Sequence, residues 1–202
     1  MIVTICILIK YMQLLRLRKG RVFMIIIIGK SGSGKSTVVD ELTKLGYKKV
    51  LTDTTRPMRP GEVQGVDYNF LSQEEFDLNK ENGVYAEDVV YNASFGQVSY
   101  GSKKEDYLNS DDKSVIILNP YGLLMADEND CLNHVFKVYL RLTDELILER
   151  LSKRGDSMKE VQRRLLTDEV DFANMESHCD LVIDITKDMT PEYVAKLILE
   201  EK

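Results

Sequence analysis

Residues 29–37, GKSGSGKST, have the composition of a phosphate-binding loop, and the first eight match G-x-x-x-x-G-K-[ST] at every fixed position. Glycines let successive backbone N–H groups turn inward around an anion, and a following helix directs its positive end there. Lys35 adds a mobile charge on the transferring phosphate, and Ser36 offers a hydroxyl to Mg²⁺. These features predict nucleotide binding and leave open hydrolysis, transfer or switching. The predicted ATP-binding residues are Gly29, Lys30, Ser31, Gly32, Ser33, Gly34, Lys35, Ser36 and Thr37.

Residues 54–70, TTRPMRPGEVQGVDYNF, form a second candidate phosphate site. Arg56 and Arg59 lie three positions apart, and each is followed by a proline that stiffens the backbone. Two such guanidinium groups make a preorganised fork that suits a dianionic phosphate. An exposed basic turn would explain the two charges, but not the tyrosine and glycines that follow at close spacing.

Residues 150–164 are rich in lysine and arginine and have the pattern of a helical flap. Arg150, Arg154 and Arg164 are suited to closing over a phosphoryl group, because its transfer needs alignment and positive charge rather than an enzyme nucleophile. Taken alone, the same residues would equally suit a solvated helix face.

Strands and helices alternate around these segments. Residues 24–29, MIIIIG, are β-branched and bounded by glycine, which is typical of a parallel strand buried on both faces. Residues 35–45 have apolar side chains at helical spacing. Further buried strands are expected at 48–51, 114–118, 135–142 and 181–185. Helix starts are expected at Ser72 and Ser157, each with a glutamate three residues on, and at Thr190 before Pro191.

This alternation predicts an α/β protein with a doubly wound parallel sheet. Two stretches interrupt it. Residues 53–102 contain short alternating segments at 67–71, 84–91 and 97–101, which predict a small inserted β-rich lobe. Residues 150–164 form the second interruption and predict the helical flap.

The composition of the 202 residues bounds the class of protein. The formal charge is −6, and leaving out the first 23 residues, with five basic residues and no acid, makes it −11. Such an acidic body repels nucleic-acid backbone, so small nucleotides are the expected partners. Cys6, Cys131 and Cys179 are an odd number without metal-like spacing, which favours reduced thiols in the cytoplasm.

Residues 1–23 allow several interpretations. A membrane span is disfavoured because the apolar run breaks at Lys10, short of the roughly 20 residues that a bilayer needs. A signal peptide is disfavoured because the positive charge follows the apolar stretch. An N-terminal basic helix and a start-site artefact remain. We expect translation to begin at Met24, because codons for residues 19–21 can resemble a bacterial ribosome-binding site.

Residues 54–70 resemble the acceptor loop of guanylate kinases, in which T-T-R-x-x-R-x-G-E-x-x-G-x-D-Y-x-F recurs nearly in full. The resemblance continues through YAE at 85–87, SYGS at 99–102, RLSKRG at 150–155 and Arg164, and covers residues 24–202. It implies a three-layer P-loop NTPase fold with a parallel central sheet, an inserted nucleoside monophosphate (NMP)-binding lobe at about 53–102 and a helical lid at about 150–164.

The resemblance also implies roles for single residues. Glu87 would bind the purine edge, since a carboxylate accepts from both the ring N–H and the exocyclic amine of guanine, donors that adenine lacks there. Asp88 is its nearest competitor, but strand alternation directs it to the opposite face. The implied GMP-binding residues are Thr52, Arg56, Arg59, Tyr68, Glu87, Tyr100, Ser102 and Asn119. The implied catalytic residues are Lys35, Arg56, Arg150, Arg154 and Arg164, and the implied metal contact is Ser36.

The chain departs from the family pattern in two places. Members usually carry D-x-D at the end of a central strand, whereas this chain has Ile117 and Asn119. An amide brings no charge, so acceptor specificity and metal affinity stay open. Glu87 and Tyr100 also lie about four residues further apart than in typical members, an excess assigned to the turn 92–96. The longer 87–100 hairpin either leaves the base site intact or moves Glu87 away.

The leading prediction is a cytoplasmic guanylate kinase-like enzyme, monomeric or homodimeric, that uses ATP and Mg²⁺ to convert GMP or dGMP to GDP or dGDP. One alternative takes another ribo- or deoxyribonucleoside monophosphate. A non-catalytic module that binds a protein partner is disfavoured because the donor loop is complete. A GTPase switch is weaker still, since no N-K-x-D motif occurs. Ribose or deoxyribose preference, oligomeric state and cellular or mobile-element origin stay open.

Overall fold

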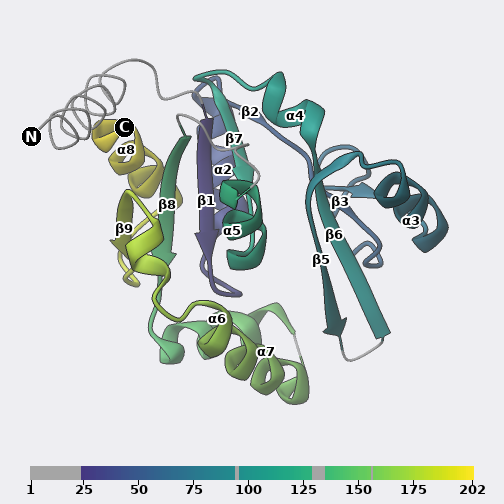
Figure 1. The fold of residues 1–202 in the computed structure, drawn as a ribbon. Coiled ribbons are helices and arrows are strands. Elements are labelled where there is room, and N and C mark those ends of the chain that lie inside the picture. The colour runs from purple at the N-terminus through teal and green to yellow at the C-terminus, as the bar shows by residue number, and fades with distance from the viewer. Residues whose placement is uncertain (1–23, 94–95, 129–134, 156) are drawn as a thin grey trace, which may run out of the picture.

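The computed structural model describes residues 24–93, 96–128, 135–155 and 157–202 as two sheets with surrounding helices (Figure 1). The predictions for residues 1–23, Cys6, Cys131 and turn residues 94–95 lie outside this part. No helix within it is long and apolar enough to cross a membrane. The strands are β1 (Met24–Gly29), β2 (Lys48–Lys49), β3 (Asp53–Thr54), β4 (Asn69–Phe70), β5 (Tyr85–Ala93), β6 (Gly96–Lys103), β7 (Ser114–Ile117), β8 (Val135–Arg141) and β9 (Leu181–Asp184). The helices are α2 (Lys35–Lys44), α3 (Gln73–Glu81), α4 (Lys104–Leu108), α5 (Pro120–Glu128), α6 (Asp144–Arg154), α7 (Met158–Asp171), η1 (Met175–His178) and α8 (Pro191–Glu201).

Five parallel strands in the order β2-β7-β1-β8-β9 form the larger sheet. β1 lies in the middle, with Ile25 in register with Val115 of β7 and Phe136 of β8. The predicted parallel sheet is confirmed. At its edge β2 covers only residues 48–49 of the expected 48–51, where it pairs with β7 alone.

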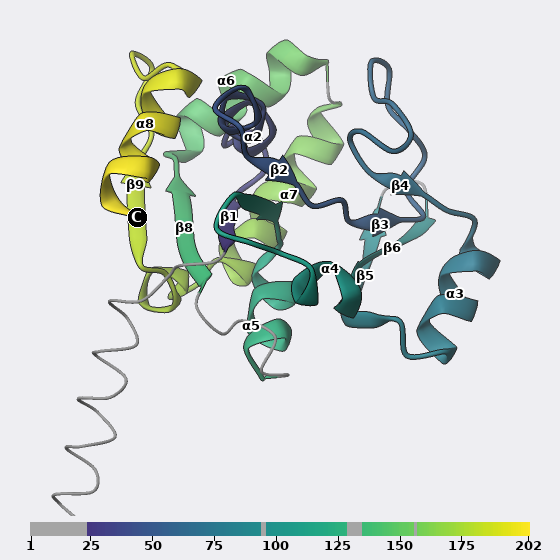
Figure 2. The ribbon, with the colours of Figure 1, turned by 90° about the horizontal axis from the view of Figure 1, so that it is seen from above.

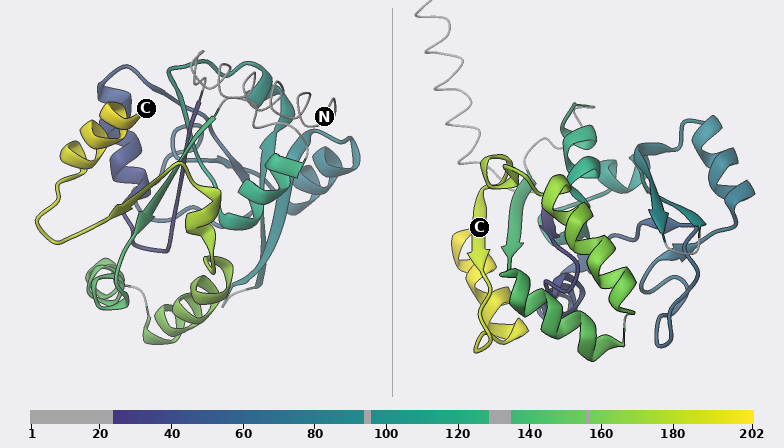
Figure 3. Two further views of the ribbon diagram at one scale, coloured as in Figure 1. Left: turned by 60° about the vertical axis from the view of Figure 1, so that its left-hand side comes forward. Right: turned by 90° about the horizontal axis from the view of Figure 1, so that it is seen from below.

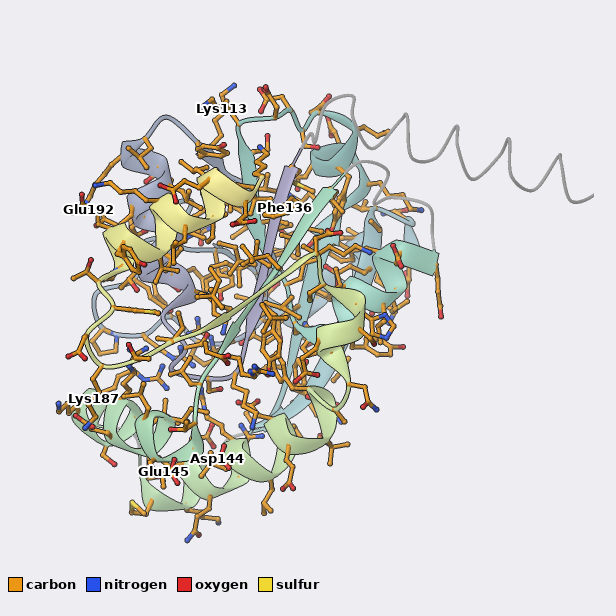
Figure 4. All side chains as sticks on the ribbon, turned by 90° about the vertical axis from the view of Figure 1, so that its left-hand side faces the viewer. Lys113, Phe136, Asp144, Glu145, Lys187 and Glu192 are labelled. Atoms are coloured by element: carbon orange, nitrogen blue, oxygen red, sulfur yellow. The ribbon has the colours of Figure 1, made fainter. Side chains whose placement is uncertain are left out.

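Helices cover both faces of this sheet because β1 is apolar on both sides. Ile25 and Ile27 pack with side chains of α2, α6 and α8, whereas Met24 and Ile28 pack with side chains of α5 and of the segment after α7. All four are at most 1% exposed. Figure 4 shows Phe136 of β8 among the side chains beneath α8. The three-layer prediction is therefore confirmed.

The second sheet forms a lobe with the order β4-β3-β6-β5, and Figure 2 shows it beside the larger sheet with α3 at its outer side. Asp53 of β3 is fully buried at its centre. Its carboxylate accepts from Asn69 Nδ2 at 2.8 Å and from the Tyr85 hydroxyl at 3.0 Å, and Lys103 Nζ lies 3.4 Å away. These contacts join four strands, so the predicted inserted β-rich lobe is a distinct sheet.

β5 and β6 form a long antiparallel hairpin. After a register shift at Ala86, the ladder runs from Glu87 opposite Ser102 to Ala93 opposite Gly96. Residues 92, 93 and 96, which the sequence prediction assigned to a turn, are instead paired in the ladder. Pairing satisfies backbone groups that a longer turn would leave to water. The paired ladder places Glu87 directly opposite Ser102.

The predicted flap at 150–164 is the junction of a larger helix pair, α6 and α7. Ile147, Leu151 and Val161 are 0% exposed and pack against the larger sheet's core. Gly155, with φ 88°, ends α6. Figure 3 shows both helices across the carboxyl ends of the strands. The pair is thus anchored in the core as well as facing the site.

Two of the three predicted helix starts have the expected caps, at Ser72 and Thr190. The third start, at Ser157, is confirmed, but only half of the capping box, in which serine and glutamate each accept the other's backbone N–H, is formed. The Ser157 hydroxyl accepts from the Glu160 backbone N–H at 3.3 Å. The Glu160 carboxylate, however, bonds to two arginines of α7 instead of returning to the cap, because charge-assisted bonds are stronger than a bond to a neutral N–H.

Candidate active site

A cavity of about 230 Å³ lies between the phosphate loop, the lobe and α7. It collects residues far apart in the sequence. The predicted site residues that line it are Gly29, Ser31, Lys35, Thr52, Arg56, Tyr68, Glu87, Tyr100, Asn119 and Arg164. The predicted site residues outside its lining are Lys30, Gly32, Ser33, Gly34, Ser36, Thr37, Arg59, Ser102, Arg150 and Arg154. Lys30, Ser33 and Ser102 of this second group directly contact or pair with residues of the first.

The phosphate loop joins β1 to α2 through glycines in conformations that other residues rarely adopt. Gly32 and Gly34 have φ of 79° and 91°. A Cβ on Gly29 would lie 2.7 Å from a carbonyl oxygen of β8. Ser36 and Thr37 are exposed in the first turn of α2. The predicted order of strand, glycine loop and helix is confirmed, and Ser36 is an exposed residue at the start of α2.

Lys35 is folded back onto the loop. Its Nζ donates to the carbonyl oxygens of Gly29 at 2.5 Å and Lys30 at 3.1 Å, and to Ser33 Oγ at 3.3 Å. Burial lowers the pKa of Lys35 to about 8, while the nearby Asp168 carboxylate opposes the shift. A phosphate group beside this amine would raise its pKa again, because an opposite charge favours the charged form.

Arg56 is 5% exposed and is held by Glu62, to which the sequence prediction gave no role. Two guanidinium nitrogens donate to the Glu62 oxygens at 2.9 and 2.8 Å, and Nε donates to the Tyr100 hydroxyl at 3.2 Å. The ring centroid of Tyr68 lies 5.3 Å from the guanidinium carbon. Although burial raises it, the pKa of Glu62 falls below its ordinary value through hydrogen bonds from Arg56 and from the Arg59 backbone. The sequence signal that could have identified Glu62 was its position as an acid three residues after Arg59 in a tight turn.

Arginines of the helix pair reach the phosphate loop. Arg150 donates to the carbonyl oxygen of Gly32 at 3.1 Å, and Arg164 donates to a loop hydroxyl at 3.4 Å. Arg154 lies at the exposed end of α6. Burial lowers the pKa of Arg59, and guanidinium groups including those of Arg164 and Arg154 lower it further. The predicted arginines therefore create a shared positive field around the phosphate loop.

Glu87 and Ser102 form a buried pair, 3% and 0% exposed. Within the described part of the chain, Glu87 Oε2 and Ser102 Oγ have no hydrogen-bond partner. Burial raises the pKa of Glu87 to about 7, and the adjacent Ser102 offsets only part of that shift. Asp88 instead bonds to Lys80 of α3, so the predicted alternation is confirmed. Glu87 lines the cavity and Ser102 does not, so the Glu87 carboxylate is the member of this pair that a ligand in the cavity would meet.

The end of β7 places Asn119 at the cavity wall. Its Oδ1 accepts the backbone N–H of Gly122 at 2.7 Å, so Asn119 caps the start of α5. Gly122 also leaves room for Glu87, because a Cβ there would lie 2.8 Å from Glu87 Oε2. Thr52 is 8% exposed and lines the same cavity. Asn119 therefore has a structural role as a helix cap, and its role in acceptor binding stays a prediction.

One face of α7 adds charged groups that the sequence prediction did not select. Glu160, Asp168 and Asp171 all line the cavity. Asp168 Oδ2 accepts the backbone N–H of Ser31 at 2.7 Å, and Glu160 accepts from Arg164 Nε at 2.8 Å. Charged residues occur at positions 160, 164, 168 and 171, which is the spacing of one helix face. This pattern is the sequence signal that could have identified the acidic residues.

A phosphate loop after the central strand of a parallel sheet, together with a second cationic site in an inserted lobe, defines a class of protein. Both sites face one cavity, and arginines of a helix pair lie above the loop. This arrangement is that of a P-loop kinase whose acceptor is itself an anion, and the class is ATP-dependent nucleoside monophosphate kinases.

The comparisons with known proteins give the family. The family model for guanylate kinase matches residues 21–198. Guanylate kinase from Rubrobacter xylanophilus is 34% identical over 179 residues, covering 83% of this chain and 88% of the relative. Guanylate kinase from Gloeobacter violaceus is 30% identical over 185 residues, covering 88% and 87%. This chain therefore belongs to the guanylate kinase family.

Solved structures agree with this assignment. The crystal structure of guanylate kinase from Anaplasma phagocytophilum matches with a TM-score of 0.62 and 27% identity, covering 89% of this chain and 84% of that one. Shikimate kinase from Acinetobacter baumannii, with a TM-score of 0.50 and 14% identity, covers 89% and 92% and shares the fold alone.

Proposed function

We propose that the protein transfers the γ-phosphoryl group of ATP to GMP or dGMP and releases ADP with GDP or dGDP. The observation that carries this proposal is the buried Glu87 side chain, which lines the same cavity as the phosphate loop and whose Oε2 has no hydrogen-bond partner in the described part of the chain. Family membership supports the same two substrates.

Glu87 and Ser102 select the base in this proposal, with Thr52 beside them. Ionised Glu87 accepts from the ring N–H and the exocyclic amine of guanine together, whereas adenine lacks those donors at that edge. A buried carboxylate left without these bonds is costly, which penalises other bases. Gly122 is needed to leave space for this carboxylate.

The phosphate of the acceptor is held by Arg56, Arg59, Tyr68 and Tyr100. Arg56 is already fixed by Glu62 and Tyr100, so little side-chain freedom is lost when the phosphate binds. In this proposal residues 53–102 are the NMP-binding lobe. Residues 150–164 belong to the lid, which consists of α6 and α7.

The transfer itself needs no covalent enzyme intermediate. An oxygen of the acceptor phosphate attacks the γ-phosphorus, the bond to the β–γ bridging oxygen breaks, and ADP leaves with the electron pair. The protein supplies alignment, which contributes roughly 7 to 11 kcal/mol in well-oriented reactions, and positive charge. The groups proposed to supply that charge are Lys35, Arg56, Arg150, Arg154 and Arg164.

The residues present fit a magnesium ion held mostly by the nucleotide. Mg²⁺ typically keeps several waters and binds substrate phosphates with few protein ligands. Ser36 presents an exposed hydroxyl at the start of α2, and the described residues contain no group of three or more acidic, histidine or cysteine side chains that could hold a metal. When bound, Mg²⁺ would neutralise charge on the β- and γ-phosphates.

One specific observation favours a different acceptor base as the second candidate function. Asn119 stands where family members usually carry an acid, and its oxygen already caps α5. The base site therefore has one fixed carboxylate, Glu87, instead of two. A non-catalytic protein-binding module is disfavoured by the complete phosphate loop.

A substrate panel tests these functions. The full-length protein is mixed with ATP, Mg²⁺ and each ribo- and deoxyribonucleoside monophosphate, and ADP release is followed. We expect turnover with GMP and dGMP to exceed that with the other acceptors by at least about a hundredfold. Preference for another base would support the second candidate, and no turnover with any acceptor would overturn the enzymatic proposal.

We also propose a cytoplasmic enzyme that is monomeric or homodimeric, to be tested by light scattering. Translation from Met24 stays a prediction. The intact mass of the natively expressed protein distinguishes it from translation of all 202 residues.

A further inference from the structure

An acidic side chain of the lid contacts the phosphate loop directly. Asp168 Oδ2 of α7 accepts the backbone N–H of Ser31 at 2.7 Å, although the two residues are 137 positions apart. One helical turn earlier, Arg164 donates to the Ser31 hydroxyl at 3.4 Å. The lid thus places a carboxylate and a guanidinium group on the same loop residue.

This carboxylate stands where the loop concentrates positive potential. Backbone N–H groups of a phosphate loop form a cradle for anions, and its lysine reaches the β- and γ-phosphates of a nucleotide. Asp168 is close enough to Lys35 to be the main influence opposing the burial that lowers the lysine's pKa. Arg164 and Arg154 act on the same lysine with the opposite sign. Asp168 is therefore the counter-charge of a cationic cluster.

We propose that Asp168 is an internal substitute for the γ-phosphate and a specificity-determining residue of the donor site. The γ-phosphate and the Asp168 carboxylate are both anions that seek the same N–H group and the same cations. Two anions that compete for one N–H group repel each other, so entry of ATP displaces Asp168 from Ser31. The inference rests on the proposed function only in taking ATP as the donor.

Displacement has a structural consequence because Asp168 and Arg164 belong to one helix. Releasing Asp168 requires α7 to shift or its side chain to turn away. The proposal assigns this release to the γ-phosphate, so ADP, which lacks that group, is expected to leave the contact in place. Arg164 stays oriented meanwhile, because Glu160 of the same helix holds its Nε at 2.8 Å. In this proposal the γ-phosphate of ATP therefore replaces Asp168 at the phosphate loop, while Arg164 stays near the loop.

Binding measurements on Asp168→Asn test the proposal without any acceptor. The amide keeps an oxygen for the Ser31 N–H but removes the charge. Calorimetric titrations of the full-length protein with ATP and with ADP, both with Mg²⁺, give the ratio of the two affinities. We expect the variant to bind ATP about tenfold more tightly and ADP within about twofold of the unmodified protein.

Asp144→Asn is the matched control. Asp144 also pairs with the phosphate loop, through Lys30 Nζ at 3.2 Å, but its side chain is 64% exposed at the start of α6 (Figure 4). It loses the same charge near the same loop, so a general electrostatic effect would appear equally in both variants. We expect the ratio of ATP to ADP affinity to stay unchanged in this control.

A fluorescence reporter tests the movement of α7. The chain has no tryptophan, and Leu166 of α7 is 68% exposed, so Leu166→Trp adds a single probe. We expect ATP to shift its emission and ADP to leave it unchanged, with a smaller ATP response after adding Asp168→Asn.

An unchanged affinity ratio in Asp168→Asn, or weaker ATP binding, would overturn the proposal, since the carboxylate would then be neutral toward or supportive of the γ-phosphate. A failure of GMP phosphorylation would leave these binding results intact. The two proposals can therefore fail separately.

Discussion

The donor and acceptor ends of the cavity satisfy their polar groups in opposite ways. At the donor end, Lys35 donates to three oxygens of its own loop and Ser31 donates to Asp168. At the acceptor end, Glu87 Oε2 and Ser102 Oγ are buried and have no partner in the described part of the chain. One end is internally neutralised, and the other keeps its hydrogen-bonding capacity for a ligand.

This difference means that the two ends of the cavity contribute differently: the donor end to nucleotide binding and transfer, and the acceptor end to the choice of base. A donor site with internal partners must exchange them when a nucleotide binds, so its net gain is the difference between two sets of contacts. An unpartnered buried carboxylate gains its full hydrogen bonds only with the matching base. We therefore expect changes at the donor end to affect the transfer step most, and changes at the acceptor end to affect the choice of base.

The largest effect is expected from Lys35→Ala. Removing the charge that we propose to act on the transferring phosphate should lower kcat by at least about a thousandfold, because electrostatic stabilisation in a water-excluded site is a dominant catalytic term. Steady-state kinetics with ATP and GMP measure it. Lys44→Ala, on the exposed face of the same helix, is the control and should keep full activity. Comparable losses in both variants would contradict a catalytic role for Lys35.

Glu87→Gln should come next. Its amide cannot accept from both guanine donors, so kcat/KM for GMP should fall about a hundredfold while the KM for ATP changes less than about twofold. The acceptor panel measures the change in base preference. Asp88→Asn, on the opposite face of β5, should leave that preference unaltered. An unchanged preference in Glu87→Gln would remove this residue from base recognition.

A smaller effect is expected from pH. Burial raises the pKa of Glu87 to about 7, so the carboxylate that we propose to bind the base is mostly protonated at pH 6 and mostly ionised at pH 8. The affinity for GMP should therefore rise about tenfold between these values, whereas ATP affinity should not follow the same profile. Calorimetry with GMP across this range checks it. The same profile in Glu87→Gln would assign the titration to another group.

The smallest effect is expected from Asn119→Ala. The variant loses the cap of α5, which should lower the free energy of unfolding by about 1 kcal/mol. Asn119→Asp keeps a capping oxygen and should lose less than about half of that. Chemical denaturation measures both variants. Equal stability of Asn119→Ala and the unmodified protein would show that the cap contributes nothing.

Local chemistry made much of this site predictable. The phosphate loop is one continuous segment, so its place between strand and helix could be predicted, and its glycines, Lys35 and Ser36 selected as candidates, from spacing alone. The paired arginines at 56 and 59 were assigned in the same way. Glu62 lies within residues 54–70, yet its bidentate contact with Arg56 depends on how the turn folds back. Asp168 was hidden because its partner lies 137 residues away.

The sequence by itself determined the elements that depend on neighbours along the chain: the apolar strand 24–29, the glycine loop, the caps at Ser72 and Thr190, and the family. Tertiary structure decided which polar groups have partners within the protein and which buried polar groups have none in the described part of the chain. Pairing across β5 and β6 buries Glu87 beside Ser102, and packing of α7 over the loop brings Asp168 to Ser31. Burial and long-range contact set these properties, and neither is encoded in any short stretch of residues.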